Sequence, residues 1–430
     1  QKGGVVTGRV VDELGEPVLE ANVRVMRQAW FCGRRRMTDA GFGTTNDLGV
    51  FRVFGLPPGE YFVQATARST ASTFLRDSSA VDYAPTYYPG TSDLASAQPV
   101  AVAPSLETSA DITLLPVRVT SIAGQVLASS GKPLAGGRVT ALPQAEGPTM
   151  VFSQPRGASI KADGTFELTG LAPGTYLVSA SASDAFPGGA GDREFAQQTV
   201  TVAGEPIRGL TLVLAAGGIA RGRVVYEGTP PANPGSLRIF SRPADDSVTM
   251  MLGGPPPEVS ADGTFEVKGL VGRRLLTVSP ASPGGLQGWG VKAVLIGGRD
   301  VQDTGYDFAP GRTVTGVEIV MSQQFASIAG TVADDRGQRL TDYSVLVVAD
   351  DREKWFLPSM RWLKSARADQ DGAFKVEYLP AGRYLVVAVD SLDTSTLGDP
   401  EEIERLRAFA TEVTVDDTEK KTVTLTIARP

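Results

Sequence analysis

One group of residues recurs four times along the chain in the same order. Each copy has a phenylalanine two residues after a glycine, a leucine five residues after that phenylalanine, and a tyrosine or leucine after ten residues. The phenylalanines are Phe51, Phe166, Phe265 and Phe374, at spacings of 115, 99 and 109 residues. A fixed order repeated at this length indicates that one folding unit occurs four times.

The local chemistry of each copy is that of β-hairpins. An Asp-Gly or Asp-Leu-Gly turn precedes each phenylalanine, and glycine supplies the positive φ that tight hairpins need. Around the turn, apolar and polar residues alternate with the period of two that is typical of half-buried strands. Short strands with turn signals every 8–12 residues or so predict a β-sandwich. The chain is therefore predicted to be all-β, with its cores centred on the four phenylalanines and the leucines that follow them: Leu56, Leu171, Leu270 and Leu379.

Further landmarks mark the start and the end of each copy. A Gly-x-Val run opens each one, 42 to 44 residues before the phenylalanine, and an apolar run closes it. The boundaries are therefore expected at 1–117, 118–216, 217–323 and 324–430. The third copy diverges, because it has Leu275 in place of tyrosine and lacks the Pro-Gly turn. No long Gly/Ser or Pro-rich linker separates the copies, so we expect little freedom between domains.

One segment of the last copy has the signals of a short helix. Asp399 suits the N-cap, and Pro400 suits the first helical position. Ile403, Leu406 and Phe409 are predicted to form one apolar face that packs on the domain's own sandwich, with docking to a partner as the alternative.

These motifs together resemble the carboxypeptidase regulatory-like domain family. The matching elements are the Gly-x-Val strand, the turn from Pro133 to Gly136, the Asp-Gly-x-Phe hairpin and the Leu-x-Pro-Gly-x-Tyr step. The resemblance implies four tandem Ig-like or transthyretin-like (prealbumin-like) β-sandwich domains, in a multi-copy bacterial secreted protein. It implies an accessory role as a spacer, docking module or surface-protein segment, without peptidase activity.

The composition argues against an enzyme. The chain has no histidine, which removes Ser-His-Asp and Cys-His systems and the usual catalytic zinc sites. Paired carboxylates keep a third, enzymatic reading open. The hairpin aspartates are interpreted as turn formers rather than metal ligands. We therefore predict no catalytic residue, no cofactor and no bound metal.

Charge and hydropathy limit the partners and the location. A net charge of −7 disfavours nucleic acid, and no apolar run approaches the roughly 18–20 residues of a membrane helix. The chain begins at Gln1 rather than Met, so a signal peptide is expected to have been removed before it. A secreted, extracellular or cell-surface location is predicted.

The four tryptophans all lie outside the repeated landmarks: Trp30, Trp289, Trp355 and Trp362. Aromatic side chains on loops can stack on sugars or anchor a protein partner. They can equally close the end of a sandwich. These four are the candidate contacts to a partner or a glycan.

The leading functional prediction is a non-enzymatic extracellular structural or interaction protein, a semi-rigid building block of tandem domains. Both chain ends resemble halves of the internal junctions, so self-association by end-to-end or edge contacts into a surface fibre or filament is expected. Other cell-surface components are further possible partners. The alternative is a carbohydrate-binding or adhesion protein that uses the tryptophans.

Overall fold

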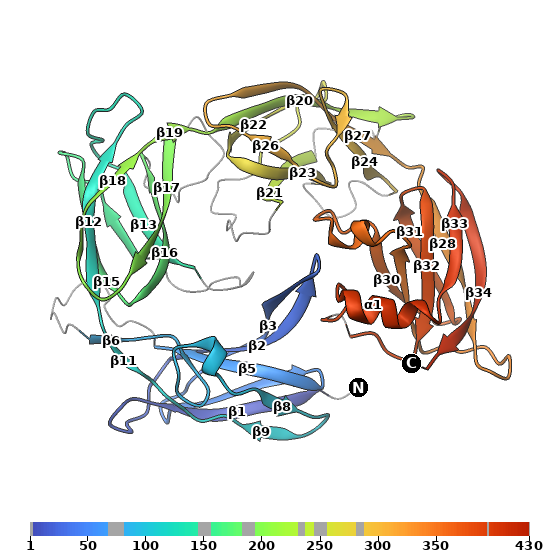
Figure 1. Cartoon of the computed structure of the whole chain (residues 1–430), viewed down its shortest axis with the longest axis horizontal. Helices are drawn as coiled ribbons and strands as arrows, with labels where there is room; N and C mark the ends of the chain where they lie inside the picture. The colour runs from blue at the N-terminus through green and yellow to red at the C-terminus, as the bar shows by residue number, and fades with distance from the viewer. Residues whose placement is uncertain are drawn as a thin grey trace. The chain divides into compact units, whose positions relative to one another are not determined.

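The computed structural model is built almost entirely of β-strands (Figure 1). It describes residues 3–67, 81–144, 156–182, 194–230, 237–244, 256–280, 288–393 and 395–429. The strands form four successive β-sandwiches, as the repeat predicted. Contacts divide the chain into two compact units, the first containing most of residues 1–215 and the second most of residues 216–430. Each unit holds two sandwiches. The exact domain boundaries stay a prediction.

The first unit contains β1 to β18. In the first sandwich, one sheet has the order β10-β1-β4 with β9 beside β1, and the other has β3-β2-β5-β7 with β8 beside β5. In the second sandwich, a β15-β12-β18 sheet packs on a sheet containing β14, β13, β16 and β17. The elements of the first sandwich are β1 (Gly4–Val11), β2 (Asn22–Phe31), β3 (Arg34–Thr44), β4 (Val50–Leu56), β5 (Gly59–Thr66), β6 (Val81–Tyr83), β7 (Thr86–Tyr87), the 3-10 helix η1 (Leu94–Ser96), β8 (Val100–Val102), β9 (Glu107–Ser109) and β10 (Ile112–Thr113). Those that follow are β11 (Pro116–Arg118), β12 (Thr120–Leu127), β13 (Arg138–Pro143), β14 (Arg156–Ser159), β15 (Thr165–Leu171), β16 (Gly174–Ser181), β17 (Glu194–Val202), β18 (Ile207–Val213) and β19 (Ala215–Ala216).

The second unit contains β20 to β34. The third sandwich pairs a β22-β20-β27-β24-β25 sheet with a β21-β23-β26 sheet. In the fourth, β34 joins both halves into one folded sheet of order β30-β29-β32-β34-β28-β31, with β33 beside β32. The elements of the third sandwich are β20 (Gly218–Glu227), β21 (Leu237–Pro243), β22 (Thr264–Leu270), β23 (Gly272–Pro280), β24 (Gly290–Ile296), β25 (Arg299–Asp300), β26 (Tyr306–Phe308) and β27 (Thr313–Ser322). Those of the fourth are β28 (Ala326–Ala333), β29 (Ser344–Ala349), the 3-10 helix η3 (Arg352–Phe356), β30 (Leu363–Arg367), β31 (Ala373–Leu379), β32 (Gly382–Val389), α1 (Pro400–Arg407), β33 (Thr411–Val415) and β34 (Lys420–Ala428).

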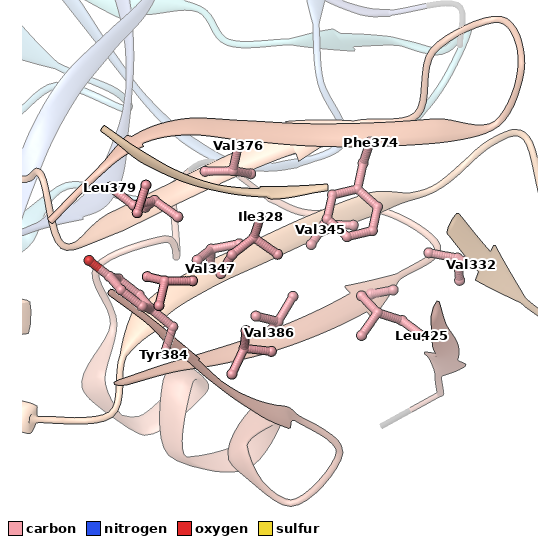
Figure 2. Packing of buried hydrophobic residues seen from close by; sticks show 14 of the residues in the cluster. Ile328, Val332, Val345, Val347, Phe374, Val376, Leu379, Tyr384, Val386 and Leu425 are labelled. Carbon is pink, nitrogen blue, oxygen red and sulfur yellow. The ribbon is translucent and has the colours of Figure 1, made fainter. Parts of the chain in front are cut away.

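Each sandwich has its own hydrophobic core, centred on the predicted phenylalanine and leucine. All four phenylalanines are at most 5% exposed, and all four leucines at most 2%. Figure 2 shows the arrangement in the fourth domain, where Phe374, Leu379 and Tyr384 extend into the space between the strands. The core prediction from the repeat is confirmed.

The glycine of the Gly-x-Val run is required by a close approach of two strands. In every domain the opening strand pairs in parallel with the closing strand, as β28 does with β34. A Cβ on Gly8, Gly124, Gly222 or Gly330 would overlap a backbone carbonyl oxygen at or beside that closing strand. Any larger residue would therefore force the two strands apart.

The hydroxyl of the repeat tyrosine forms a hydrogen bond across the turn that precedes it. The hydroxyls of Tyr61, Tyr176 and Tyr384 donate to the carbonyl oxygen four residues earlier, at 2.6, 2.9 and 2.7 Å. In these three turns the glycine has φ of 154°, 154° and 159°, whereas Gly272 in the divergent third copy has φ of 70°. Leu275 has no hydroxyl to donate, so the third turn has a different geometry.

The predicted helix is present as α1. The Asp399 side chain accepts a hydrogen bond from the Glu401 backbone N–H at 3.0 Å, as expected of an N-cap. Ile403 and Leu406 are buried in a cluster on the outer side of the fourth sandwich, which confirms the expected packing. Phe409 differs from the prediction, because it follows the helix end and is 47% exposed. Across the described residues, none of the helices has the length and apolar character of a membrane span.

Candidate binding site between the third and fourth domains

A salt bridge joins the third sandwich to the fourth inside the second unit. Arg361, just before β30, donates from Nε and Nη2 to the two carboxylate oxygens of Asp303, at 2.7 and 2.8 Å. Its Nη1 donates to the Lys292 carbonyl at 3.1 Å and to Gln302 Oε1 at 2.9 Å. The guanidinium is therefore held in a single orientation by groups of the neighbouring domain.

Asp303 collects further donors from the fourth domain. The Trp362 indole N–H donates to Oδ2 at 3.0 Å, and the Ser359 hydroxyl donates to Oδ1. Burial opposes ionisation of this carboxyl, but the hydrogen bonds from Arg361, Ser359 and Trp362 outweigh it and lower its pKa. Asp303 is thus an ionised carboxylate that is stabilised by protein hydrogen-bond donors within a domain interface.

A second ionic contact lies on the same junction. The Lys292 ammonium, on β24, donates to Asp417 at 2.9 Å and to Glu227 at 3.1 Å. The hydrogen bond to Asp417, together with that to Glu227, raises the pKa of Lys292 despite partial burial.

A pocket of about 530 Å³ opens beside these contacts. Its aromatic walls come from Trp289 on the third domain, Phe325 in the linker, and Tyr378 on the fourth domain. Its charged lining residues are Lys292, Arg361, Lys364 and Asp417. The Phe325 and Tyr378 rings lie 5.2 Å apart at 59°. A Cβ on Gly290 would lie 3.0 Å from both rings, so a side chain there would require the rings to shift by a few tenths of an ångström.

The first unit has a comparable junction. β11 pairs with β6 in antiparallel register, Pro116 opposite Tyr83, which links the exit of the first sandwich to the entry of the second. Arg156 of the second sandwich forms a 2.7 Å ion pair with Asp82 on β6. Each unit therefore carries an Arg–Asp pair across its junction.

The structure places the four candidate tryptophans in different environments. Trp289 is 9% exposed, lies on the pocket wall and meets the Tyr226 ring edge to face at 5.1 Å. Trp355 is 1% exposed and donates its indole N–H to the Ala349 carbonyl. Trp362 is 7% exposed and stacks on Tyr384 at 6.2 Å. Trp30 is half-buried on β2, with the Arg35 guanidinium 5.1 Å from its ring centre.

These environments bear on the glycan hypothesis without testing it. Trp355 and Trp362 have their indole N–H groups paired inside the protein, and a sugar could reach their faces only if the packing opened. Trp289 lines a pocket, and Trp30 retains exposed surface. Contact of the four residues with a glycan or a partner stays a prediction.

Two of the four hairpin aspartates, Asp163 and Asp262, accept hydrogen bonds within their own turns. Asp163 accepts from the Thr165 N–H and hydroxyl at 3.0 and 2.7 Å, and Asp262 accepts the same pair of bonds from Thr264. The threonine hydroxyl bond, with the backbone bond, lowers the pKa of both carboxyls. In the first and fourth copies, the side chains of Asn46 and Asp369 hold the turn instead.

Sequence reasoning missed the two features that define this junction. The Arg361–Asp303 pair joins residues 58 positions apart and follows no repeat. Tyr378 could have been identified by comparing the copies. The fourth residue after the core phenylalanine is a glycine in the other three copies: Gly55, Gly170 and Gly269.

The family comparison agrees with the β-sandwich fold of the first two domains. A model of the carboxypeptidase regulatory-like domain matches residues 5–114 and 121–203. The first two sandwiches are carboxypeptidase regulatory-like domains. The third and fourth sandwiches lie outside the matched residues but share the repeated phenylalanine and leucine of those domains. A search of curated proteins found no match to the sequence.

Several solved structures, two of them of pilins, show a weak similarity. A streptococcal ancillary pilin is 13% identical, with 73% of this chain and all of the pilin covered, at a TM-score of 0.22. The minor pilin GBS52 of Streptococcus agalactiae is 13% identical, with 49% and 95% covered, at 0.25. The Bacillus anthracis TIE protein is 10% identical, with 95% and 68% covered, at 0.18. TM-scores this low do not establish a common arrangement.

Proposed function

We propose that this chain is a non-enzymatic structural protein outside the cell, in which carboxypeptidase regulatory-like and related sandwiches form semi-rigid pairs. The observation that carries the proposal is the bidentate Arg361–Asp303 bridge across the junction of the third and fourth domains. A structural spacer needs its domains held at a defined angle, and a partly buried, planar ion pair restricts rotation more than a flexible linker does. The extracellular location is supported by the family resemblance.

The proposal also includes association of the chain with itself. Its support is a group of exposed apolar side chains on the first domain, Leu48, Val50 and Phe54, which are 61%, 39% and 73% exposed. The charged Arg52 lies between Val50 and Phe54 on β4, and Phe54 lies opposite Val5 of β1. Exposed apolar side chains on a sheet face are typical of protein contact surfaces. Light scattering of Phe54→Lys and of the native chain over a wide concentration range tests this; a single-chain mass for the native protein throughout contradicts it.

The rigidity is tested by distance measurements across the junction. Spin labels are placed at the exposed positions Thr315 and Thr424 in a Cys32→Ser background, and pulsed electron resonance gives the width of the distance distribution. The native pair should give one narrow distribution, and Arg361→Met should broaden it.

The matched control is Arg223→Met. Arg223 makes a similar ion pair with Glu318, but within the third domain, with the arginine side chain 65% exposed. This variant should leave the distribution unchanged. A distribution that is equally broad in the native chain and in Arg361→Met contradicts the proposal.

A further inference from the structure

Tyr378 occupies a backbone conformation that the other three domains assign to glycine. Four residues after the core phenylalanine, φ is 78° at Gly55, 72° at Gly170, 76° at Gly269 and 59° at Tyr378. In the fourth domain, Ala326 pairs with Leu379 and Ile328 with Val376, so two residues oppose one and Tyr378 is the extra residue of a β-bulge. Left-handed bulge residues are normally glycine, because a Cβ is strained there.

Packing accounts for only part of the Tyr378 side chain in this strained position. The Tyr378 side chain is 38% exposed, and its ring meets Phe325 and faces the pocket. A side chain held in a strained conformation with part of its surface open to solvent suggests a binding role rather than a contribution to stability.

A neighbouring lysine holds the bulge in place. The Lys364 ammonium donates to the carbonyls of Glu377 and Tyr378 at 2.6 and 3.0 Å, and lies 5.6 Å from the Tyr378 ring centre. The two carbonyls that the bulge turns out of the ladder are thereby satisfied. The ring is thus presented to the pocket from a fixed backbone.

The charges around the pocket balance within the site. Lys292 is paired with Asp417 and Glu227, and Arg361 with Asp303, while Lys364 donates to two backbone carbonyls, so these three cations are matched by three carboxylates. The polar lining thus combines donors and acceptors without a strong field of one sign. Such a lining suits a neutral ligand rich in hydroxyl groups.

We propose that this pocket binds a neutral saccharide, with the Tyr378 ring as its stacking surface and Lys292 and Asp417 as partners for its hydroxyls. A pyranose ring has an apolar face of C–H groups that packs on an aromatic ring, and equatorial hydroxyls that need both donors and acceptors. The pocket volume of about 530 Å³ lies within the range usual for small-ligand sites. The saccharide proposal is independent of the proposal that the domains form semi-rigid pairs, which the distance measurement tests separately.

The test combines a glycan array with calorimetric titration of neutral oligosaccharides into the full chain. The native protein should bind at least one neutral saccharide, with an affinity that is insensitive to salt. Tyr378→Gly, which restores the residue of the other domains, should weaken binding by about tenfold or more and leave the unfolding midpoint unchanged or raised. Tyr378→Phe should retain binding, because the ring remains.

The control is Phe409→Ala, which removes an exposed aromatic ring of the same domain that does not line the pocket and should not alter saccharide affinity. The proposal is overturned if the native chain binds no neutral saccharide, or if Tyr378→Gly binds as well as the native chain. A lower unfolding midpoint with a broadened distance across the junction would also overturn it, because the ring would then serve as a clamp between domains.

Discussion

Replacing Gly330 with alanine isolates the close approach of the opening and closing strands. The added Cβ would overlap the Val423 carbonyl oxygen and lie 3.1 Å from Cε1 of Phe374. Backbone atoms cannot yield as a flexible side chain does, so β28 and β34 must separate locally. Their parallel pairing runs from Ser327 opposite Lys420 to Ala333 opposite Thr426, and Gly330 lies at its centre.

The expected cost follows from what that separation disrupts. Losing two or three backbone hydrogen bonds costs about 1 kcal/mol each, and displacing a packed phenylalanine costs about 1–3 kcal/mol. Alanine has less conformational entropy than glycine in the unfolded chain, and this offsets only about 0.4–1 kcal/mol of the destabilisation. The net destabilisation of the fourth domain should therefore be about 2–6 kcal/mol, a large part of the stability of a domain.

Gly337→Ala is the matched control in the same domain. Gly337 has φ of 77° and open space around its Cβ position, so alanine there meets backbone strain without a clash. Its cost should be about 1 kcal/mol. Urea unfolding of the full chain, followed by tryptophan fluorescence in a Trp30→Phe, Trp289→Phe background, reports on Trp355 and Trp362 of the fourth domain. Equal costs for the two substitutions, within about 0.5 kcal/mol, would refute the close-approach argument.

Two further predictions concern the fourth domain. Tyr384→Phe removes the hydroxyl hydrogen bond to the Pro380 carbonyl while keeping the buried ring. It should lower the unfolding free energy by about 1 kcal/mol in urea titrations. Leu275→Phe in the third domain, by comparison, removes no such hydrogen bond. Burial lowers the pKa of Lys364 to about 8, against the nearby Glu377 charge that raises it. Between pH 8 and 10.5 the unfolded amine therefore binds more protons than the folded one, so the stability should rise with pH across this window. Urea midpoints should show that rise in the native chain and a flatter profile in Lys364→Met; an identical slope in both would contradict the assignment.

The elements that sequence reasoning predicted well depend on local chemistry. The hairpins followed from Asp-Gly turns and period-two alternation, and α1 followed from Asp399 and Pro400 at its start. Features that depend on distant contacts were not predictable in the same way. Gly330 was recognised as a landmark, but its reason, the Val423 carbonyl, lies 93 residues away on the closing strand.

The candidate site was predictable only in part. Trp289 was singled out as an aromatic residue outside the repeat, and it lines the pocket. Trp355 and Trp362 were singled out by the same criterion and are buried, because composition alone does not distinguish a core indole from an exposed one. Comparing the copies position by position identifies Tyr378, whereas the partner of Arg361 depends on how two domains meet.

The parallel pairing of first and last strands determines how each domain responds to a pulling force. When neighbouring terminal strands run in parallel, the chain enters the domain at one end and leaves at the other. Tension applied through the chain then acts along the strands and shears all the hydrogen bonds between them together, instead of opening them one at a time. In the fourth domain seven residue pairs share that load between β28 and β34, and in the third domain eight pairs share it between β20 and β27. Each domain should therefore unfold under tension only at high force, through rupture of this strand pair.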